Sequence, residues 1–299
     1  MTRRAPIPAQ LAAHPFRVAD AMAAGVTRGR LRARDLAAPH RGIRVGAGAS
    51  NDIVARCRAY ATARAPNRVF SHVTAARLLG LPLPWKYRPS EPLHVTAWGG
   101  ARTPRGAGVR GHQTRSVPRR VTVEGVATLA PADAWCSLAP LLDLESLIVA
   151  GERLLHPFKP LATVGQIDAA IARYGDRRGA RTLRLAREQM RACSASPRKT
   201  KLRRRAVAAG YPEPEPNGRI VLPGGRIAFG DLVYRRYQVI LEYDGEHHLE
   251  YEQWQRDIDR LNALAAAGWL VVRVERGSDL RAVLGYLDAA LRLRGWRPG

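Results

Sequence analysis

The residues best suited to chemistry in this chain are three carboxylates near its C-terminal end, Asp231, Glu242 and Asp244. Two histidines, His247 and His248, follow the last of them directly. Hard divalent cations prefer clusters of oxygen ligands of this kind. The stretch therefore predicts a site for Mg²⁺ or Mn²⁺, provided that the fold brings the carboxylates together.

The apolar residues around the carboxylates predict a hairpin that would do so. A two-residue turn at residues 235–236 sets Asp231 opposite Ile240 in an antiparallel pair. Directly paired residues share a face, as do residues two apart on one strand, so all three carboxylates are expected on one side. A slip of one residue would move Asp231 away from Glu242.

A hairpin bearing ion pairs instead of a metal is the alternative interpretation. Glu242 follows the apolar run at residues 239–241, so we expect its side chain to be partly buried. A buried carboxylate needs a partner, which is either a metal ion or one of the many arginines. Both interpretations stay open at this point.

The charge balance indicates a polyanionic partner. The chain has 49 Lys and Arg against 25 Asp and Glu, a net charge of +24, and an isoelectric point near 11.3. Nucleic acid is the commonest partner of proteins with such a large positive charge, and DNA is the partner expected here.

The cysteines and the hydropathy narrow the class of protein further. Cys57, Cys136 and Cys193 are isolated, so neither a disulfide framework nor a cysteine zinc site is expected. No signal segment and no apolar run of about 18 residues is visible. We expect a cytoplasmic protein without membrane contact, and the sequence does not indicate its oligomeric state.

Residues 1–50 have the pattern of a winged helix-turn-helix. A short helix is expected to end at Gly25, and Thr27 to cap a second helix over residues 28–36. Residues 41–46 resemble a β wing, and the second helix of such modules enters the major groove. A small helical bundle with a solvated basic face is the alternative. The arginines expected to face DNA are Arg28, Arg30, Arg32 and Arg34.

The middle of the chain predicts a mixed α/β module. Helices are expected over residues 53–64, 71–81, 133–142 and 144–155, and a strand over residues 93–96. His72, His94 and His112 have no ligand-like spacing relative to one another. His72, beside Ser71, is expected to be a structural or capping residue rather than a catalyst.

A strongly basic segment follows over residues 174–205. It predicts a helix, a linker at residues 193–197 and the first helix of the last domain. Such a run is either a solvated face or a track along a phosphate backbone. The residues of that helix expected to contact nucleic acid are Arg198, Lys199, Lys201 and Arg203.

The last part of the chain predicts a mixed sheet flanked by helices. Besides the hairpin it has a helix over residues 250–267 ended by Gly268, a strand over residues 269–274, and a helix over residues 279–292 capped by Ser278. The whole chain is expected to be α/β (α+β overall). Its expected parts are a winged helix-turn-helix at 1–50, an α/β module at 51–175, a basic helical linker at 176–193 and the sheet domain at 194–299.

The part from about residue 194 to residue 296 resembles a bacterial endonuclease-domain family related to the very short patch repair endonucleases, within the PD-(D/E)XK nuclease fold. The likeness rests on Gly230-Asp231, on the run at residues 242–248, on Arg256-Asp257 with Arg260, and on Gly268-Trp269. It implies a restriction-endonuclease-like mixed sheet that hydrolyses phosphodiesters with Mg²⁺ or Mn²⁺.

The resemblance also implies roles for single residues. Asp231 would bind the metal with Glu242, and His247 or His248 would assist proton transfer. Asp244 stands where the motif usually has a lysine, so it would bind a second metal ion instead. Lys199 stands where the family usually has a glutamate that orients the metal or its water, and a lysine there repels a cation.

Residues 8–155 resemble the AbiEi-type antitoxin module that often precedes this nuclease-like domain in actinobacterial proteins. The likeness rests on the runs at residues 24–31, 71–76 and 93–96 and on Arg41-Gly42. The chain as a whole is thus expected to be a DNA-binding protein with a metal-dependent endonuclease domain. The alternative is an antitoxin-like transcriptional regulator with a degenerate nuclease domain, and an RNA-binding scaffold comes third.

Overall fold

A computed structural model describes residues 5–63, 65–192, 196–244, 251–275 and 277–298, without the side chains of residues 244, 251–254 and 256. Within these residues the chain is a mixed α/β protein with 11 α-helices and three sheets of three, five and four strands. It divides into two compact units, residues 1–142 with 165–183, and residues 143–164 with 184–299. None of the described helices is both long enough and apolar enough to cross a membrane.

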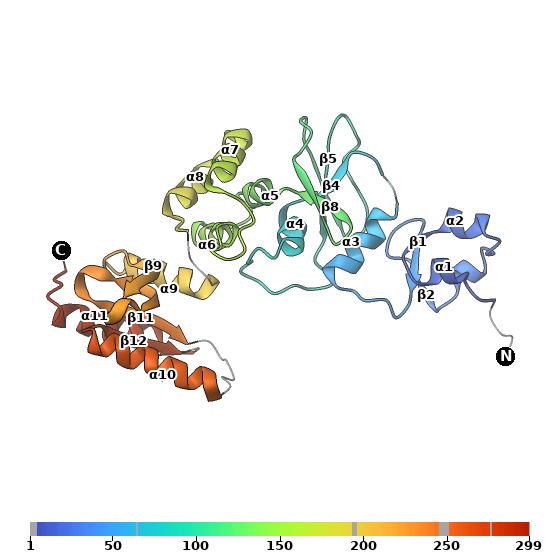
Figure 1. The fold of residues 1–299 in the computed structure, drawn as a ribbon. Coiled ribbons are helices and arrows are strands. Elements are labelled where there is room, and N and C mark those ends of the chain that lie inside the picture. The colour runs from blue at the N-terminus through green and yellow to red at the C-terminus, as the bar shows by residue number, and fades with distance from the viewer. Residues whose placement is uncertain (1–4, 64, 193–195, 245–250, 276, 299) are drawn as a thin grey trace. The chain divides into compact units, whose positions relative to one another are not determined.

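The N-terminal part of the first unit is a three-stranded antiparallel sheet with two short helices (Figure 1). Phe16, Ala21 and Leu31 form its buried core. Its elements in chain order are α1 (Ala9–Ala12), β1 (Phe16–Arg17), α2 (Val18–Ala23), the 3-10 helix η1 (Arg30–Arg32), β2 (Leu36–Ala37) and β3 (Ile43–Gly46), and the sheet order is β1-β3-β2.

The predicted second helix over residues 28–36 is wrong, because only the single turn η1 forms there. Thr27 does cap this turn, since its Oγ1 accepts a hydrogen bond from the amide of Arg30 at 3.2 Å. Gly29 weakens helix formation inside the segment. Ala33 is extended, and the guanidinium of Arg30 holds both carboxylate oxygens of Asp35 at 3.0 and 2.7 Å. The chain therefore turns back into β2.

A five-stranded sheet forms the larger part of the first unit, with strand order β6-β5-β4-β8-β7. The pairs β4–β8 and β5–β6 are parallel, and the other two pairs are antiparallel. Helix α3 covers one face around Cys57, and α4 and α5 cover the other around Ala75 and Ala134. The elements are α3 (Ile53–Ala61), β4 (Arg68–Phe70), α4 (His72–Leu78), β5 (Leu93–Ala97), β6 (Val109–Gln113), β7 (Arg120–Val123), β8 (Val126–Leu129), α5 (Pro131–Ser137) and α7 (Val164–Tyr174).

The second unit is a four-stranded mixed sheet, ordered β12-β11-β10-β9, between two layers of helices (Figure 1). One face packs against α9 and α11 through Leu202 and Leu287, and the other packs against α10 through Leu264. The elements are α6 (Leu144–Leu154), α9 (Pro197–Ala208), β9 (Glu215–Val221), β10 (Ile227–Tyr234), β11 (Val239–Asp244), α10 (Tyr251–Ala266), β12 (Leu270–Glu275) and α11 (Leu280–Leu293). Helix α8 (Ala180–Gln189) lies at the boundary between the units in the chain.

The carboxylate hairpin forms, but the predicted register is wrong by two residues. Strands β10 and β11 pair Val233 with Ile240, so Asp231 is not opposite Ile240. The cause is a longer turn, the 3-10 helix η3 (Arg235–Tyr237) closed by Gln238 in the left-handed conformation at φ 50°. A shift of two residues keeps the alternation of faces, and it brings Asp231 level with Glu242.

Gly230, directly before Asp231, is required by close packing. A Cβ at this position would lie 2.8 Å from the side chains of Ile240 and Val233. Two further features of this unit differ from the prediction. Strand β9 was not predicted, and the N-cap of α11 is Asp279 rather than Ser278, since the carboxylate of Asp279 accepts a hydrogen bond from the amide of Ala282.

A buried ion pair joins α6 to α9 within the second unit. Glu152 and Arg203 are each 1% exposed, and Arg203 Nη2 lies 2.6 Å from Glu152 Oε1. Thr200 donates its hydroxyl to Glu152 Oε2 at 2.5 Å, and the amide of Arg191 donates to Oε1 at 2.9 Å. The carboxylate is thus fully hydrogen-bonded, as a buried charge must be.

Candidate functional site

Asp231 is held by a cation of the protein itself. Its Oδ1 pairs with the Nζ of Lys199, which α9 presents from its first turn. Its Oδ2 accepts a hydrogen bond from the amide of Tyr243 at 3.0 Å. Helix α9 begins here because Ser196 caps it, accepting from the amide of Lys199, and because Pro197 stands at the first helical position. Lys199 therefore contacts the carboxylate that was expected to bind a metal ion.

Glu242 is held by Arg260 of α10 in a two-pronged ion pair. The Nη1–Oε1 distance is 2.6 Å and the Nη2–Oε2 distance is 2.8 Å. Glu242 is 8% exposed, as its place after an apolar run predicted. Arg260 also contacts Asp257 at 2.8 Å, and the hydrogen bonds that it donates to Glu242 and Asp257 raise the pKa of its guanidinium. A planar guanidinium matches a carboxylate well, so this pair fixes the end of β11 against α10.

These contacts leave no free oxygen on either described carboxylate. The four oxygens of Asp231 and Glu242 all have donors from the protein. The side chain of Asp244 lies outside the described part of the chain, and so do His247 and His248. Of the three predicted carboxylates, the structure therefore describes Asp231 and Glu242, and each is paired with a cationic side chain of the protein.

The N-terminal arginines divide into exposed and engaged side chains. Arg28, Arg32 and Arg34 are exposed, whereas Arg30 is tied to Asp35 and to the carbonyl of Ala5. A hollow of about 200 Å³ beside η1 is lined by Val18, Arg28, Leu31, Arg32 and Arg44. Three of its five lining residues are arginines, which suits an anion such as a phosphate.

The basic residues of α9 are mostly engaged as well. Lys199 pairs with Asp231, and the guanidinium of Arg198 lies over the ring of Tyr243 at 5.7 Å. Lys201 is half-buried. Arg203 was expected on the exposed basic face, but it is buried and paired with Glu152, so it does not face a nucleic acid. Helical periodicity places it on the buried side of α9 with Thr200 and Ala206, which are three positions before and after it.

The first unit contains a cluster of three histidines that the sequence spacing did not reveal. His72 is the first residue of α4, His94 lies on β5 and His112 lies on β6. In the parallel pair β5–β6, Thr96 is opposite His112, and His94 is two residues before Thr96, so both histidines share the face covered by α4. The alternation of side chains along β5 and β6 could have indicated that His94 and His112 share a face. That inference requires the parallel pairing of β5 with β6, which was not predicted.

The three imidazoles contact one another. His94 Nδ1 lies 3.0 Å from His112 Nε2, and the rings of His72 and His112 are stacked with centroids 3.7 Å apart. One nitrogen from each ring lies within 4.8 Å of the others, and this is the one set of three or more His, Cys, Asp or Glu side chains with such geometry in the described part of the chain. His72 Nδ1 also contacts the hydroxyl of Ser71 at 2.9 Å.

The environment keeps these imidazoles uncharged. Burial, followed by the neighbouring imidazoles and Arg110, lowers the pKa of His72 to about 2 and that of His94 to about 4. Burial and Arg110 also lower the pKa of His112. All three rings are therefore neutral at pH 7, with lone pairs available.

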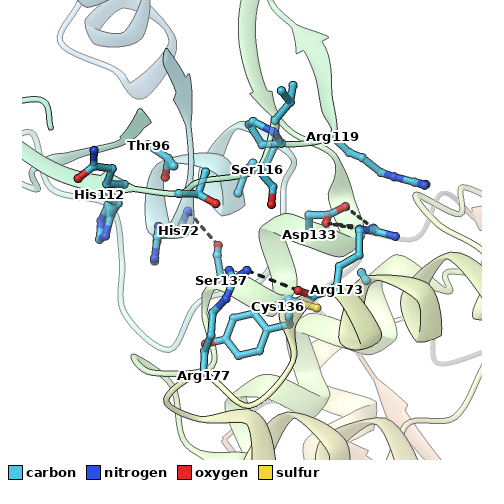
Figure 2. Close-up of a pocket in the computed structure, with 17 residues that line it drawn as sticks. His72, Thr96, His112, Ser116, Arg119, Asp133, Cys136, Ser137, Arg173 and Arg177 are labelled. Carbon is cyan, nitrogen blue, oxygen red and sulfur yellow. Dashed lines mark hydrogen bonds and ion pairs between the residues drawn. The ribbon is translucent and has the colours of Figure 1, made fainter. Parts of the chain in front are cut away.

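A pocket of about 470 Å³ opens beside the cluster (Figure 2). His72 and His112 line one side of it, and Asp133, Arg173 and Arg177 line another. Arg173 and Asp133 form an ion pair at 2.9 Å. The pocket thus combines neutral imidazoles with guanidinium groups.

The chain matches no protein-family model, and it matches no curated protein. The resemblance to endonuclease domains and to AbiEi-type modules therefore stands on the sequence motifs given above.

Proposed function

We propose that this protein binds DNA through its exposed arginines and does not cleave it in its natural form. The net charge of +24 supports binding to a polyanion. The order helix, strand, helix, turn, strand, strand of the N-terminal part supports a winged module in which η1 replaces the usual second helix. Arg28, Arg32 and Arg34 on and around η1 are the exposed cations that would contact the phosphates.

The ion pair between Lys199 and Asp231 is the observation that favours binding without cleavage. A divalent cation at Asp231 would meet the ammonium of Lys199 in direct contact with its ligand. It would also find both oxygens of Glu242 occupied by Arg260. Two like charges at such a distance disfavour each other, so metal binding requires Lys199 to leave. These contacts support our proposal that the C-terminal part is a nuclease-like domain in which Lys199 occupies the position of the metal.

Metal-dependent cleavage is the competing proposal. In that case Asp231, Glu242 and Asp244 would hold Mg²⁺ or Mn²⁺ in place of the Lys199 contact, and His247 or His248 would move the proton. The ion would activate a water molecule and neutralise charge on the phosphate. This proposal depends on three residues whose side chains lie outside the described part of the chain.

The two proposals are separated by incubating supercoiled plasmid with Mg²⁺, Mn²⁺ or EDTA. We expect no nicking by the natural protein beyond that of Asp231→Ala. Lys199→Glu restores the carboxylate of the family pattern, so we expect Mg²⁺ to raise the melting temperature of this variant and not that of the natural protein. Metal-dependent nicking by the natural protein that Asp231→Ala abolishes would establish cleavage and overturn our proposal.

Binding is tested by fluorescence anisotropy with a labelled duplex over a range of salt concentrations. The affinity should fall steeply with salt, and Arg32→Ala should reduce the slope of log K against log salt by about 1. Arg235→Ala is the matched control, because Arg235 is also exposed but is paired with Glu215 in the second unit. A salt-insensitive affinity, or equal effects of the two variants, would contradict the assignment of η1.

A further inference from the structure

We propose that His72, His94 and His112 bind one divalent transition-metal ion, Zn²⁺ in the first place, with a further coordination position open to the adjacent pocket. This site is separate from the carboxylate hairpin and lies within the first unit. Its proposed role does not depend on whether the second unit cleaves DNA.

The distances between the imidazole nitrogens suit such an ion. Zinc binds histidine nitrogens at about 2.0–2.1 Å, so two ligands of a tetrahedral site lie roughly 3.4 Å apart. His94 Nδ1 and His112 Nε2 are already 3.0 Å apart, and one nitrogen of each of the three rings lies within 4.8 Å of the others. Binding of the ion replaces the hydrogen bond between His94 and His112, and it requires the stacked rings of His72 and His112 to rotate until all three lone pairs point at the ion.

The backbone of His72 is strained at the point where its ring stacks on that of His112. His72 has φ of 49°, in the left-handed region that few non-glycine residues adopt. Such strain persists only where the surroundings enforce it, and it concentrates at functional sites. Here the amide of His72 donates to Ser137 Oγ at 3.1 Å, which holds the strained residue in place (Figure 2).

Buried hydroxyl groups orient the ring of His72. Ser71 Oγ accepts a hydrogen bond from Thr96 at 2.8 Å and contacts His72 Nδ1 at 2.9 Å. Ser71 Oγ has a second lone pair, so it can accept the Nδ1 proton and leave the Nε2 lone pair free for a metal. Metal-binding histidines usually have their second nitrogen fixed in this manner.

The chemistry of the ligands selects the class of metal. Neutral imidazoles suit Zn²⁺, Cu²⁺ and Ni²⁺, whereas Mg²⁺ requires oxygen ligands. No carboxylate belongs to the set of three. The metal expected at this site is thus different in kind from the Mg²⁺ expected at the hairpin.

The pocket indicates what occupies the open position. His72 and His112 line it together with Arg119, Arg173 and Arg177, while His94 is buried behind them at 3% exposure. Three protein ligands with one open position are typical of zinc sites that bind water or a substrate. Arg173 is paired with Asp133, but the guanidinium groups of Arg119 and Arg177 favour a negatively charged occupant, so we assign water or a small anion to this position.

The test is the metal content of the purified full-length protein, measured by elemental analysis after dialysis against buffer with limited Zn²⁺. We expect one Zn²⁺ per chain in the natural protein and loss of at least about 100-fold in affinity in His112→Ala, since even indirect partners of zinc ligands change affinity by about 10–100-fold. Ser71→Ala, which removes only the orienting hydroxyl, is expected to weaken binding by about 10-fold.

Substituted Co²⁺ provides a second readout, because its visible absorption reports the coordination geometry. A tetrahedral spectrum with the natural protein and none with His112→Ala is the expected result. His14→Ala is the matched control, since His14 is an exposed histidine of the same unit. The double variant His247→Ala/His248→Ala controls for metal bound by that adjacent pair.

The metal content and the Co²⁺ spectra of these variants either support the site or overturn it. Stoichiometric Zn²⁺ that persists in both controls and disappears in His112→Ala with unchanged circular dichroism supports the site. A natural protein that takes up no Zn²⁺ or Co²⁺, or a His112→Ala variant that keeps it, overturns the proposal. In that case the three imidazoles are a hydrogen-bonded core cluster without a metal.

Discussion

At the scale of single residues, the buried pair of Glu152 and Arg203 shows what a sequence cannot reveal. The two residues are 51 positions apart, and Arg203 stands in a run of basic residues that is typical of an exposed face. Only the packing of α6 against α9 shows that Arg203 is buried. The same limit applies to Lys199, whose partner Asp231 is 32 positions away.

Glu152→Ala should destabilise the second unit by about 3–5 kcal/mol. The change leaves buried Arg203 with Glu213 as its remaining carboxylate partner and removes the acceptor of Thr200 and of the Arg191 amide, and breaking one side of a buried ion pair has a cost of that size. The free energy of unfolding from urea titration gives the measurement. Glu188→Ala is the control, because Glu188 is exposed, and its effect should stay within about 0.5 kcal/mol. Equal effects of the two changes would show that the pair contributes nothing.

Asp52→Ala should lower the stability of the first unit by about 1 kcal/mol at pH 7. Asp52 is the N-cap of α3 and accepts a hydrogen bond from the amide of Ala55 at 2.8 Å. Hydrogen bonds from Ser50 and Ala55 lower the pKa of its carboxyl group.

The pH dependence of this cap follows from the direction of the shift. Because the folded pKa lies below the unfolded value of about 3.9, the charge-dependent part of the stabilisation is complete above that value. It is lost as the pH falls through the folded pKa. Melting temperatures of the natural protein and of Asp52→Ala, compared from pH 6 to pH 2.5, should therefore converge at the acid end. A constant difference would exclude the charge as its source.

At the scale of elements, the turn between β10 and β11 controls the placement of the carboxylates. Gln238 closes this turn at φ 50°, and its carbonyl accepts a hydrogen bond from the amide of Leu270 at 2.9 Å. The turn thus sets the register of β11 with β10 and also the start of β12.

Gln238→Gly should stabilise the second unit by about 0.5–1 kcal/mol. A left-handed conformation costs a non-glycine residue about 1–2 kcal/mol, and the greater freedom of glycine in the unfolded chain offsets part of that gain. Chemical denaturation measures the change. Arg236→Gly, in η3 and outside the positive-φ positions, should instead destabilise the unit. A loss of stability with both changes would contradict the role assigned to the turn.

Elements with a strong local pattern were predictable. Helices α3, α4, α6 and α10 and strands β5 and β12 lie within a few residues of the predicted ranges, because apolar periodicity and caps are local signals. Strand β9 was missed because Pro214 and Pro216 flank and interrupt its pattern. The prediction of a second N-terminal helix was wrong because the ion pair between Arg30 and Asp35 accompanies a turn of the chain after η1. Helical periodicity gives no indication of such a contact between side chains.

The candidate sites were predictable to different degrees. The carboxylate hairpin could be predicted because its carboxylates lie close together in the sequence. The histidine cluster was not, because it depends on the parallel pairing of β5 with β6 and on the strained start of α4. Strand pairing is a long-range property, so spacing between the histidines carried no signal of it.

At the scale of the whole molecule, the second unit is discontinuous in sequence. It takes α6 from residues 143–164 and the rest from residues 184–299, while residues 165–183 belong to the first unit. A chain of residues 184–299 alone would lack α6, so it would expose the α9 surface and leave Arg203 without Glu152.

We expect residues 184–299 alone to unfold without a cooperative transition. Adding a peptide of residues 143–164 should restore the transition, because it returns the buried helix and its carboxylate. The same peptide with Glu152→Ala should restore it only partly. Circular dichroism during thermal unfolding gives the measurement. A cooperative transition of residues 184–299 that the peptide does not change would show that α6 is dispensable.

A buried cysteine gives the first unit an internal reporter of its own opening. Cys57 and Cys136 both belong to that unit, and burial raises the pKa of each thiol to about 12. Cys136 lines the pocket beside the histidines, whereas Cys57 packs between α3 and the sheet. An alkylating reagent reacts with the thiolate, so it reaches the sulfur of Cys57 only when α3 separates from the sheet. In a chain with Cys136→Ser and Cys193→Ser, the rate of alkylation therefore follows the local opening of the first unit, while unfolding confined to the second unit leaves it unchanged.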